Sequence, residues 1–524
     1  MTVNQSTGTH AAVATPPAGR ISVIVAVCLA ALILPLSFSG AAVATPAMGR
    51  DLGGSAVALT WITNAFMLTF GGLLMTSGAL ADQYGRKRVF TIGVGLFVAF
   101  SLALSFAPSI LIIDLLRAGQ GVGAAAALAG GSAAMAQEFE GQARIRAFSM
   151  LGTTFGIGLA FGPIVAGFLI ENFGWRSVFI TSTAIGALAL LFGVPRMHES
   201  RDPNAMGLDW PGVVTFTATL SLLTFGIIQA PESGWSSPLV IGILAGAVAF
   251  LGAFIAIENR VARPMLDLSL FRYPRFVGVQ LLPIATCYAY VVLLILLPLR
   301  FIGVEEMSEI DAGMLMLALS APMIVVPSIA ATLARWVSAG AISAIGLLIA
   351  SAGILWLGRL APDAGAATVA PMLLIGIGAG APWGLMDGLS VSVVPKERAG
   401  MASGIFNTSK VASEGLALAI VSTILSLFAA ESVRGLAGNA GMTASDRLSE
   451  VGQRLATGDI ANASAIVPDI AKPLLVQGYA NAFESLTHVL AAITLLSAIA
   501  IFVFLGRDTK EDKPVSGGEA QPAE

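Results

Sequence analysis

Five ionisable residues fall inside long apolar stretches of the sequence. Asp114 and Arg117 are three residues apart, and Lys410 and Glu414 are four residues apart. Asp387 has no oppositely charged residue at either spacing. A charge at the centre of a membrane-spanning helix costs about 2.5–3.5 kcal/mol on insertion scales, so it marks a candidate functional site by default. These residue types indicate proton exchange by a carboxyl group beside a fixed cation.

Each of these residues also has a purely structural interpretation. Side chains three or four residues apart are neighbours on a helix, so each acid could neutralise its base and make the span insertable. Asp387 could be a solvated residue near the inner mouth of a cavity. Asn407 falls on the helical face of Lys410 and Glu414, which favours a wetted, cavity-facing stripe there. Both interpretations stay open for all three sites.

The elements that must position these residues are membrane-spanning helices. The chain has 524 residues, of which 56% are hydrophobic and only 11% are charged, whereas a soluble domain carries about 25% charged residues. A span needs about 20 mainly apolar residues. Stretches of that kind lie near 21–44, 57–80, 89–107, 110–136, 148–171, 177–194, 211–230, 238–257, 276–300, 311–333, 340–358, 368–393, 401–428 and 484–505. The predicted fold class is therefore an all-α integral membrane protein with about fourteen transmembrane helices.

Basic residues in the loops predict the orientation of the chain. If the N-terminus lies in the cytoplasm, most of the 28 Lys and Arg residues fall in cytoplasmic loops, as the positive-inside rule requires. This asymmetry predicts a multi-pass protein of the cytoplasmic membrane with both termini inside. The net charge of −3 argues against a nucleic-acid partner, and three histidines are too few to suggest a metal cluster.

The order of the spans predicts two six-helix halves separated by two further helices. Two such halves are typical of rocking transporters with a site between them. The predicted divisions are an N-terminal tail 1–19, an N-terminal half 20–194, a two-helix linker region 195–275, a C-terminal half 276–505 that includes an extracytoplasmic loop 429–483, and a C-terminal tail 506–524. Within that loop, the sequence around "ASDRLSEVGQRLA" predicts a helix.

A short polar motif, "GALADQYGRKR" at 78–88, joins the second and third spans. Gly78 would allow close helix packing and Gly85 a tight turn. The carboxylate of Asp82 could pair with Arg86 or with a helix N-terminus. An ion pair that forms in one conformation and breaks in another biases a two-state equilibrium.

This motif resembles the inter-helix signature of the major facilitator superfamily. Further segments follow in the family's order: "RAGQGVGAA" at 117–125, "GLAFGPIVAG" at 158–167, and "LDWPGVV", "SGWSSP" and "RPMLDLSLFRYPRF" around two extra spans. Together they are similar to the fourteen-span drug–proton antiporter branch. The resemblance implies that Asp82 and Arg86 form a gating pair, with Gly78 and Gly85 in the same motif, and that Arg117 couples protonation to substrate binding.

The resemblance assigns one further group, because Gly158, Gly162 and Pro163 would bend and closely pack the fifth span. Two positions depart from the family pattern. Ser37 stands where the branch often has an acidic residue in the first span. Arg335 stands where the second half would repeat the loop aspartate.

The resemblance implies an exporter of amphipathic small molecules that works by alternating access, needs no cofactor and is driven by the proton gradient. Because Ser37 removes the usual acid, we expect Asp114, Asp387 or Glu414 to carry the proton, with Arg117 or Lys410 modulating its affinity. An uptake symporter on the same fold is the alternative, and no enzymatic motif is present. The expected partners are the substrate, protons and lipid, for a monomer. Candidate cavity residues are Trp61, Asn64, Gln120, Tyr288, Tyr290, Trp383 and Asn407.

Overall fold

The chain folds as a long bundle of apolar helices. The computed structural model describes residues 17–139, 141–201, 209–261, 264, 266, 268–362, 364–394, 399–439 and 447–506. In this part of the chain there are fourteen helical spans long and apolar enough to cross a membrane, and there is no β-strand. The predicted number of spans and the all-α fold class are therefore confirmed.

The helices are α1 (Pro17–Leu52), α2 (Ala56–Tyr84), α3 (Arg86–Leu104), α4 (Ile110–Glu138), α5 (Gly141–Phe173), α6 (Arg176–Leu188), α7 (Trp210–Ser233), α8 (Pro238–Glu258), α9 (Pro274–Thr286), α10 (Val292–Pro298), α11 (Glu309–Ser320), α12 (Pro322–Leu333), α13 (Ala339–Gly358), α14 (Val369–Ser392), α15 (Ala399–Asn439), α16 (Leu448–Ala456), α17 (Ile460–Ile466) and α18 (Lys472–Leu505). The π-helical turns Cys287–Val291 and Leu299–Val304 join α9 and α10 into one span, Pro274–Val304. Helices α11 and α12 form another, Glu309–Leu333.

Local sequence signals set several helix boundaries. Ser55, Ser109 and Ser338 precede α2, α4 and α13, and each hydroxyl accepts a hydrogen bond from a backbone N–H of the first turn. Such caps satisfy donors that a helix N-terminus otherwise leaves unpaired. Between α2 and α3 the break is a single glycine, Gly85, whose φ of 118° is a conformation that side chains disfavour.

The predicted loop 429–483 is shorter than its polar sequence suggested. Helix α15 continues to Asn439 and α18 already begins at Lys472, so both extend well beyond the apolar stretches 401–428 and 484–505. The error arises because hydropathy reports where a helix is apolar and not where it ends. The predicted helix around "ASDRLSEVGQRLA" is confirmed as α16.

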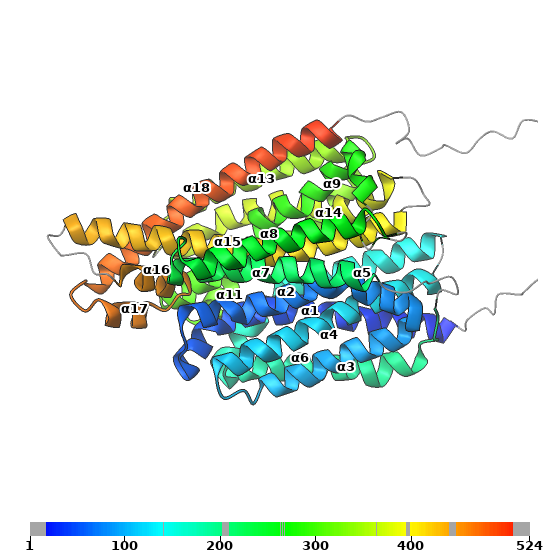
Figure 1. Ribbon diagram of the computed structural model, residues 1–524, viewed down its shortest axis with the longest axis horizontal. Coiled ribbons are helices and arrows are strands. Elements are labelled where there is room, and N and C mark those ends of the chain that lie inside the picture. The colour runs from blue at the N-terminus through cyan, green and yellow to red at the C-terminus, as the bar shows by residue number, and fades with distance from the viewer. Residues whose placement is uncertain are drawn as a thin grey trace, which may run out of the picture.

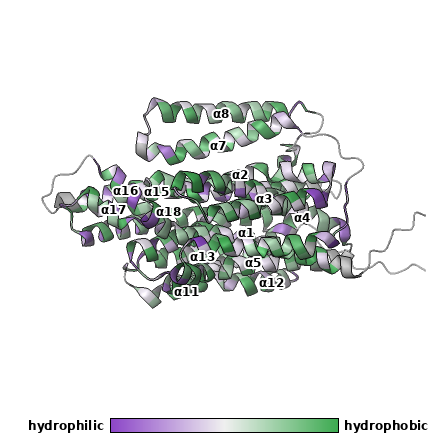
Figure 2. Cartoon of the chain, turned by 90° about the horizontal axis from the view of Figure 1, so that it is seen from below, coloured by the Kyte–Doolittle hydropathy of each residue, from purple (hydrophilic) through white to green (hydrophobic). Residues whose placement is uncertain are grey.

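The bundle has two distinct ends (Figure 1). The first described residues of α1 and the last of α18 lie at one end, which we call the terminal end. Helices α16 and α17 lie at the other, which we call the loop end. Helices α7 and α8 form a pair set apart from the remaining helices (Figure 2).

Helix α7 lies along the seam between α2 and α15. The Thr217 hydroxyl on α7 donates to the carbonyl of Gly72 on α2, at 3.3 Å. The Thr423 hydroxyl on α15 donates to the carbonyl of Ile227 on α7, at 3.0 Å. Helix α8 packs behind α7, with the rings of Phe216 and Phe254 5.4 Å apart. The helix pair is thereby attached to N-terminal and C-terminal helices alike.

Glycines bring the N-terminal and C-terminal helices into backbone contact. A Cβ on Gly71 of α2 would lie 2.8 Å from the backbone nitrogen of Ala412 on α15. A Cβ on Gly313 of α11 would lie 2.8 Å from the Cα of Ile164 on α5. Backbones can approach this closely only where a residue lacks a side chain, as in many membrane helix pairs.

One ion pair and two hydrogen bonds join N-terminal to C-terminal helices at the loop end. Arg50 Nη2 at the end of α1 lies 2.7 Å from Glu309 Oε1 at the start of α11. The Arg454 guanidinium in the last turn of α16 donates to the carbonyl of Gly54, before α2, at 2.7 Å. The Glu171 carboxylate of α5 accepts a hydrogen bond from the backbone N–H of Ile310 at 3.1 Å. The loop end is therefore closed.

The same helix pairs separate toward the terminal end. A Cβ on Gly404 of α15 would still be 3.9 Å from Met75 Cε, and one on Gly156 of α5 would be 3.5 Å from the Met323 carbonyl. Further along, a Cβ on Gly78 or Gly152 would meet nothing within 4 Å. At these positions the helices are therefore less closely packed than at Gly71 and Gly313, which lie nearer the contacts that close the loop end.

We predict that Gly71→Ala destabilises this conformation. Its methyl group would collide with the α15 backbone, and overpacking of this kind costs about 1–3 kcal/mol. The matched control is Gly95→Ala on α3, where a Cβ meets nothing within 4 Å and alanine should stabilise the helix by about 0.5–1 kcal/mol. Thermal unfolding in detergent measures both variants. Equal melting temperatures for the two would contradict the close contact.

Candidate functional site

Arg117 is a fully buried charge in the middle of the N-terminal helices. Its side chain has 0% exposure and reaches from α4 toward α1 and α2. Nε donates to the carbonyl of Ile62 at 2.9 Å, and Nη1 donates to the hydroxyl of Ser37 at 3.2 Å. Ser37 therefore lies directly against the cation at the position where the family often has an acid.

Two further side chains complete the surroundings of the guanidinium. The Gln120 carbonyl accepts a hydrogen bond from Nη1 of Arg117, and the Gln120 amide donates to the hydroxyl of Ser101 on α3 at 2.7 Å. The Phe66 ring lies 4.2 Å from the guanidinium carbon, a cation–π distance. Neutral groups from α1, α2 and α4 thus satisfy this charge, apart from Nη2, which has no hydrogen-bond partner in the described structure.

The ion pair that the structural interpretation allowed between Asp114 and Arg117 is not formed in this structure. No contact within 4 Å joins the two side chains among the described residues, and Asp114 Oδ1 is buried without a hydrogen-bond partner. The physical reason is that α1, α2 and α4 together offer the guanidinium three acceptor oxygens and an aromatic face. A single carboxylate one turn away cannot match this set of fixed contacts.

The ion pair that the structural interpretation allowed between Lys410 and Glu414 is not formed either. Lys410 Nζ lies 4.5 Å from the ring centroid of Trp383 on α14. Glu414 is half-buried and makes no ion pair with any described residue. The Lys410 amine therefore lies against an aromatic ring of another helix and not against Glu414 of its own helix.

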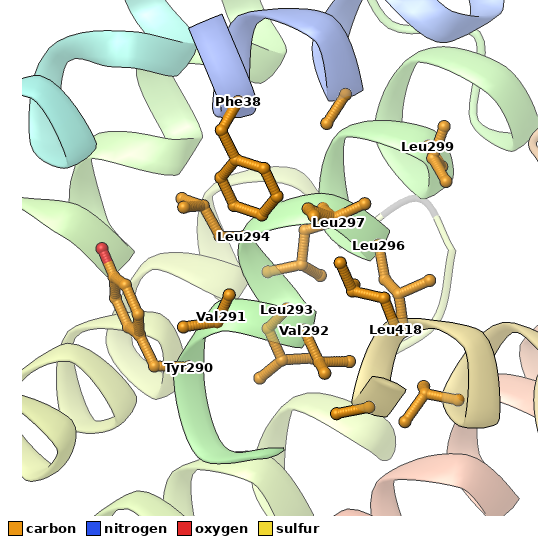
Figure 3. Close-up of a cluster of buried hydrophobic side chains, with 14 of the residues drawn as sticks. Phe38, Tyr290, Val291, Val292, Leu293, Leu294, Leu296, Leu297, Leu299 and Leu418 are labelled. Carbon is orange, nitrogen blue, oxygen red and sulfur yellow. The ribbon is translucent and has the colours of Figure 1, made fainter. Parts of the chain in front are cut away.

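A further aromatic residue packs against this tryptophan. The Tyr290 ring meets Trp383 nearly edge-on, with centroids 6.2 Å apart and an interplanar angle of 66°. Tyr290 is fully buried and Tyr288 is half-buried. In Figure 3, Tyr290 lies beside a layer of apolar side chains that includes Leu294, and Phe38 of α1 covers this layer.

The remaining candidate residues occupy different environments. Asp387 is exposed on α14, as its solvated interpretation requires. Asn64 is buried, and its carbonyl oxygen has no hydrogen-bond partner in the part of the chain described. Asn407 is half-buried. Trp61 packs against Phe225 of α7, with ring centroids 5.7 Å apart. Its aromatic partner therefore belongs to the pair of helices α7 and α8, and it is not one of the other candidate cavity residues.

The polar motif at the terminal end forms most of the expected contacts. Arg86 donates from Nε and Nη2 to Asp82 Oδ1, at 3.1 and 2.9 Å, and from Nη1 to Gln137 of α4 at 2.7 Å. Gly85 forms the predicted tight turn. Gly78 was expected to allow close packing, yet it faces open space. This expectation is wrong for the present structure, because no described atom would lie within 4 Å of a Cβ on Gly78.

Sequence reasoning missed one partner of this motif. The Glu199 carboxylate accepts hydrogen bonds from the backbone N–H groups of Lys87 and Arg88, both at 3.1 Å, and so caps the N-terminus of α3. The Lys87 amine donates to the carbonyl of Met197 at 2.6 Å. An acid that follows the sixth span could have been paired with this basic turn, but nothing in its local sequence marks it as a cap.

The fifth-span motif packs α5 against α1. A Cβ on Gly158 would lie 2.5 Å from Pro35 Cγ, and one on Gly162 would overlap the hydroxyl of Ser39. Pro163 lies inside α5, and its carbonyl would be 3.0 Å from a Cβ on Gly313 of α11. The close packing implied for these residues is present on two faces of α5. In the described part of the chain, no group of three His, Cys, Asp or Glu side chains could hold a metal ion.

Comparison with known proteins adds independent information. Residues 27–418 match the family described as Major Facilitator Superfamily. The cephamycin export protein CmcT of Amycolatopsis lactamdurans is 32% identical over 409 residues, which cover 76% of this chain and 84% of that protein. The multidrug resistance protein Stp of Mycobacterium tuberculosis (strain CDC 1551 / Oshkosh) is 30% identical over 385 residues, 73% of this chain and 72% of that protein.

Solved structures share the fold at low sequence identity. A bacterial homologue of the human lysosomal transporter Spinster, inward-facing and unoccupied, has a TM-score of 0.59 and 15% identity, covering 94% of this chain and 100% of that chain. The POT family transporter PepTSo has a TM-score of 0.62 and 14% identity, covering 94% and 98%. At these identities the likeness shows the fold alone.

We predict that Arg117→Lys strongly destabilises the protein. A lysine amine cannot reproduce the planar fork that reaches Ile62, Ser37 and Gln120 together. Losing one hydrogen bond of a charged group costs about 1.5–3 kcal/mol. The exposed Arg50→Lys serves as the control, because surface ion pairs contribute little. Thermal unfolding of the purified variants in detergent measures both effects, and an unaltered melting temperature for Arg117→Lys would contradict the described contacts.

Proposed function

Because the chain belongs to the major facilitator superfamily, we propose that it exports amphipathic small molecules across the cytoplasmic membrane in exchange for protons. The observation that carries this proposal is the conformation of the bundle. Contacts between N-terminal and C-terminal helices close the loop end, the same helices pack less closely toward the terminal end, and the carboxyl groups of Asp114 and Glu414 form no ion pair with any described residue. Alternating access requires such a conformation and its opposite.

The relatives support export as the direction of transport. Those in actinobacteria include a cephamycin export protein and a multidrug resistance protein, and the puromycin resistance protein pur8 of Streptomyces alboniger is 31% identical. Their names describe chemically diverse compounds. The aromatic rings of Trp383 and Tyr290 pack together within the bundle, and aromatic surface suits ligands of varied shape, because it binds apolar groups without a fixed pattern of hydrogen bonds.

In the proposed cycle the substrate enters from the terminal end. A proton arriving from the opposite side binds a carboxyl group and changes the balance between the two conformations. Glu414 and Asp114 are suited to this step because neither is neutralised by its neighbouring base in this conformation. A group can shift the equilibrium only if its interactions differ between the two states, and an unpaired carboxyl group can gain a partner in the opposite state.

The Asp82–Arg86 pair has a different role in the proposed cycle. It stabilises the turn at the terminal end, and Gly78 on the same helix has free space beside it. When the terminal end closes, another helix can occupy this space. The motif would then bias the equilibrium through contacts that exist in one state only.

The remaining features of the proposal concern location and partners. The protein is proposed to be a monomer of the cytoplasmic membrane, with both termini and the terminal end on the cytoplasmic side. It needs no cofactor, because the proton gradient supplies the energy. Uptake by proton symport on the same fold is the competing function, and the direction of proton movement separates the two.

We predict that one acid dominates proton exchange. The measurement is pH change inside acidified vesicles that contain purified protein, on addition of a cationic dye or puromycin. We expect Glu414→Gln to reduce substrate-induced proton release at least tenfold, and Asp114→Asn to reduce it less. The exposed Asp387→Asn should behave like the unmodified protein. Normal exchange in both buried-acid variants would refute the assignment, and proton uptake together with substrate would indicate symport.

We also predict which end of the bundle faces the cell exterior. In a background without Cys28 and Cys287, single cysteines replace Glu450, exposed on α16, and Arg335, exposed after α12. A membrane-impermeant maleimide should label the first in intact cells. It should label the second only after the membrane has been permeabilised. The reverse pattern would overturn the proposed orientation.

A further inference from the structure

The amine of Lys410 is held by an aromatic ring although a carboxylate is available one turn away. Nζ lies 4.5 Å from the ring centroid of Trp383, and no carboxylate of a described residue lies within 4 Å of it. At the same time, Glu414 occupies the i+4 position on α15, which is the favourable spacing for a helical ion pair. The surroundings of Lys410 and Glu414 therefore keep the amine and the carboxylate apart.

The Trp383 ring is fixed in place by its own packing. Tyr290 lies nearly edge-on to it at 6.2 Å and is itself fully buried. Trp383 also packs against the main hydrophobic core. The negative face of the indole is therefore presented in a defined place, and a cation is attracted to such a face most strongly where water is excluded.

We propose that Trp383 is a positioning residue that draws the Lys410 amine away from Glu414 and so keeps the Glu414 carboxyl group available to the transported proton. This inference rests on the proposed function, in which Glu414 exchanges that proton. Trp383 touches neither the proton nor the carboxyl group. It acts through Lys410, and its effect disappears when Lys410 has no charge.

Few other groups can compete for the two side chains. The Cys287 thiol, from the π-helical turn after α9, is within electrostatic range of Glu414 and bonds the Ser413 carbonyl. Asp387 follows Trp383 by one turn on α14 but is exposed and makes no ion pair with a described residue. Asn407, one turn before Lys410, is uncharged. The balance therefore lies between the indole face and the Glu414 carboxylate.

The direction of the effect follows from charge. Without the indole, the Lys410 amine can turn to Glu414, and the resulting ion pair favours the ionised carboxylate. Protonation of Glu414 then requires a more acidic solution. The pH of half-maximal substrate-induced proton exchange should fall by about half a unit to one unit, the size expected for one partly buried charge contact.

The test compares Trp383→Ala with Trp383→Phe in the vesicle assay over a range of pH. We expect the alanine variant to shift the pH profile to acid and the phenylalanine variant to restore most of it, because a ring face remains. Trp356→Ala, an exposed tryptophan on α13, controls for loss of a large side chain. A merely structural role would lower the amount of active protein without moving the profile.

A double-substitution cycle makes the inference falsifiable. In a Lys410→Gln background, Trp383→Ala should no longer move the profile, because no amine remains to reach Glu414. A full acid shift in that background would overturn the proposal. So would identical profiles for Trp383→Ala and the unmodified protein.

A second measurement separates this inference from the proposed function. In a variant whose only tryptophan is Trp383, fluorescence should change when Lys410 is replaced by glutamine, because an ammonium group over the indole alters its emission. Unchanged emission would overturn the contact itself. If the emission changes but Glu414→Gln exchanges protons normally, the contact between Trp383 and Lys410 is supported. The role of Glu414 in the proposed function is then refuted, and the role proposed for Trp383 is refuted with it.

Discussion

The structure depends on how charges are satisfied where no water is available. A buried charge keeps its place only if other groups replace its hydration. Arg117 meets this constraint with a backbone carbonyl, a hydroxyl, an amide oxygen and an aromatic face. Because these groups belong to α1, α2 and α4, the same contacts that make the charge tolerable also fix three helices relative to one another.

The two intramembrane cations are held very differently. Arg117 has several short contacts from rigid neighbours, so moving it would leave buried acceptors unpaired as well as an uncompensated charge. Lys410 has one aromatic contact at 4.5 Å on a flexible side chain. The first arrangement suits a permanent structural anchor, and the second suits a contact that changes during a transport cycle. This asymmetry agrees with the chemical inequality of the two halves that Ser37 and Arg335 indicate in the sequence.

The sequence predicted what depends on local pattern. Fourteen apolar stretches predicted fourteen spans, and the motif that contains Asp82 and Arg86 indicated that the two could pair, because both are properties of one segment. The partners of Arg117 and Lys410 could not be predicted in this way. Their i+3 and i+4 neighbours are the obvious choices from the sequence, but Ser37, Phe66 and Trp383 come from other helices and offer better geometry. Glu199 escaped prediction for the same reason, since its role depends on where the chain returns after α6.

The closed loop end raises the question of which contacts hold it and still permit it to open. The Arg50–Glu309 pair has side chains 58% and 17% exposed, and exposed ion pairs contribute only about 0–1 kcal/mol. The glycine contacts of α2 with α15 and of α5 with α11 are close backbone contacts, with two glycines in each helix pair. Dispersion forces of this kind fall steeply with distance, so a small rotation removes many of them together. Backbone packing therefore holds the loop end closed in one conformation and is readily lost when the helices rotate toward the other conformation. Alternating access needs this property.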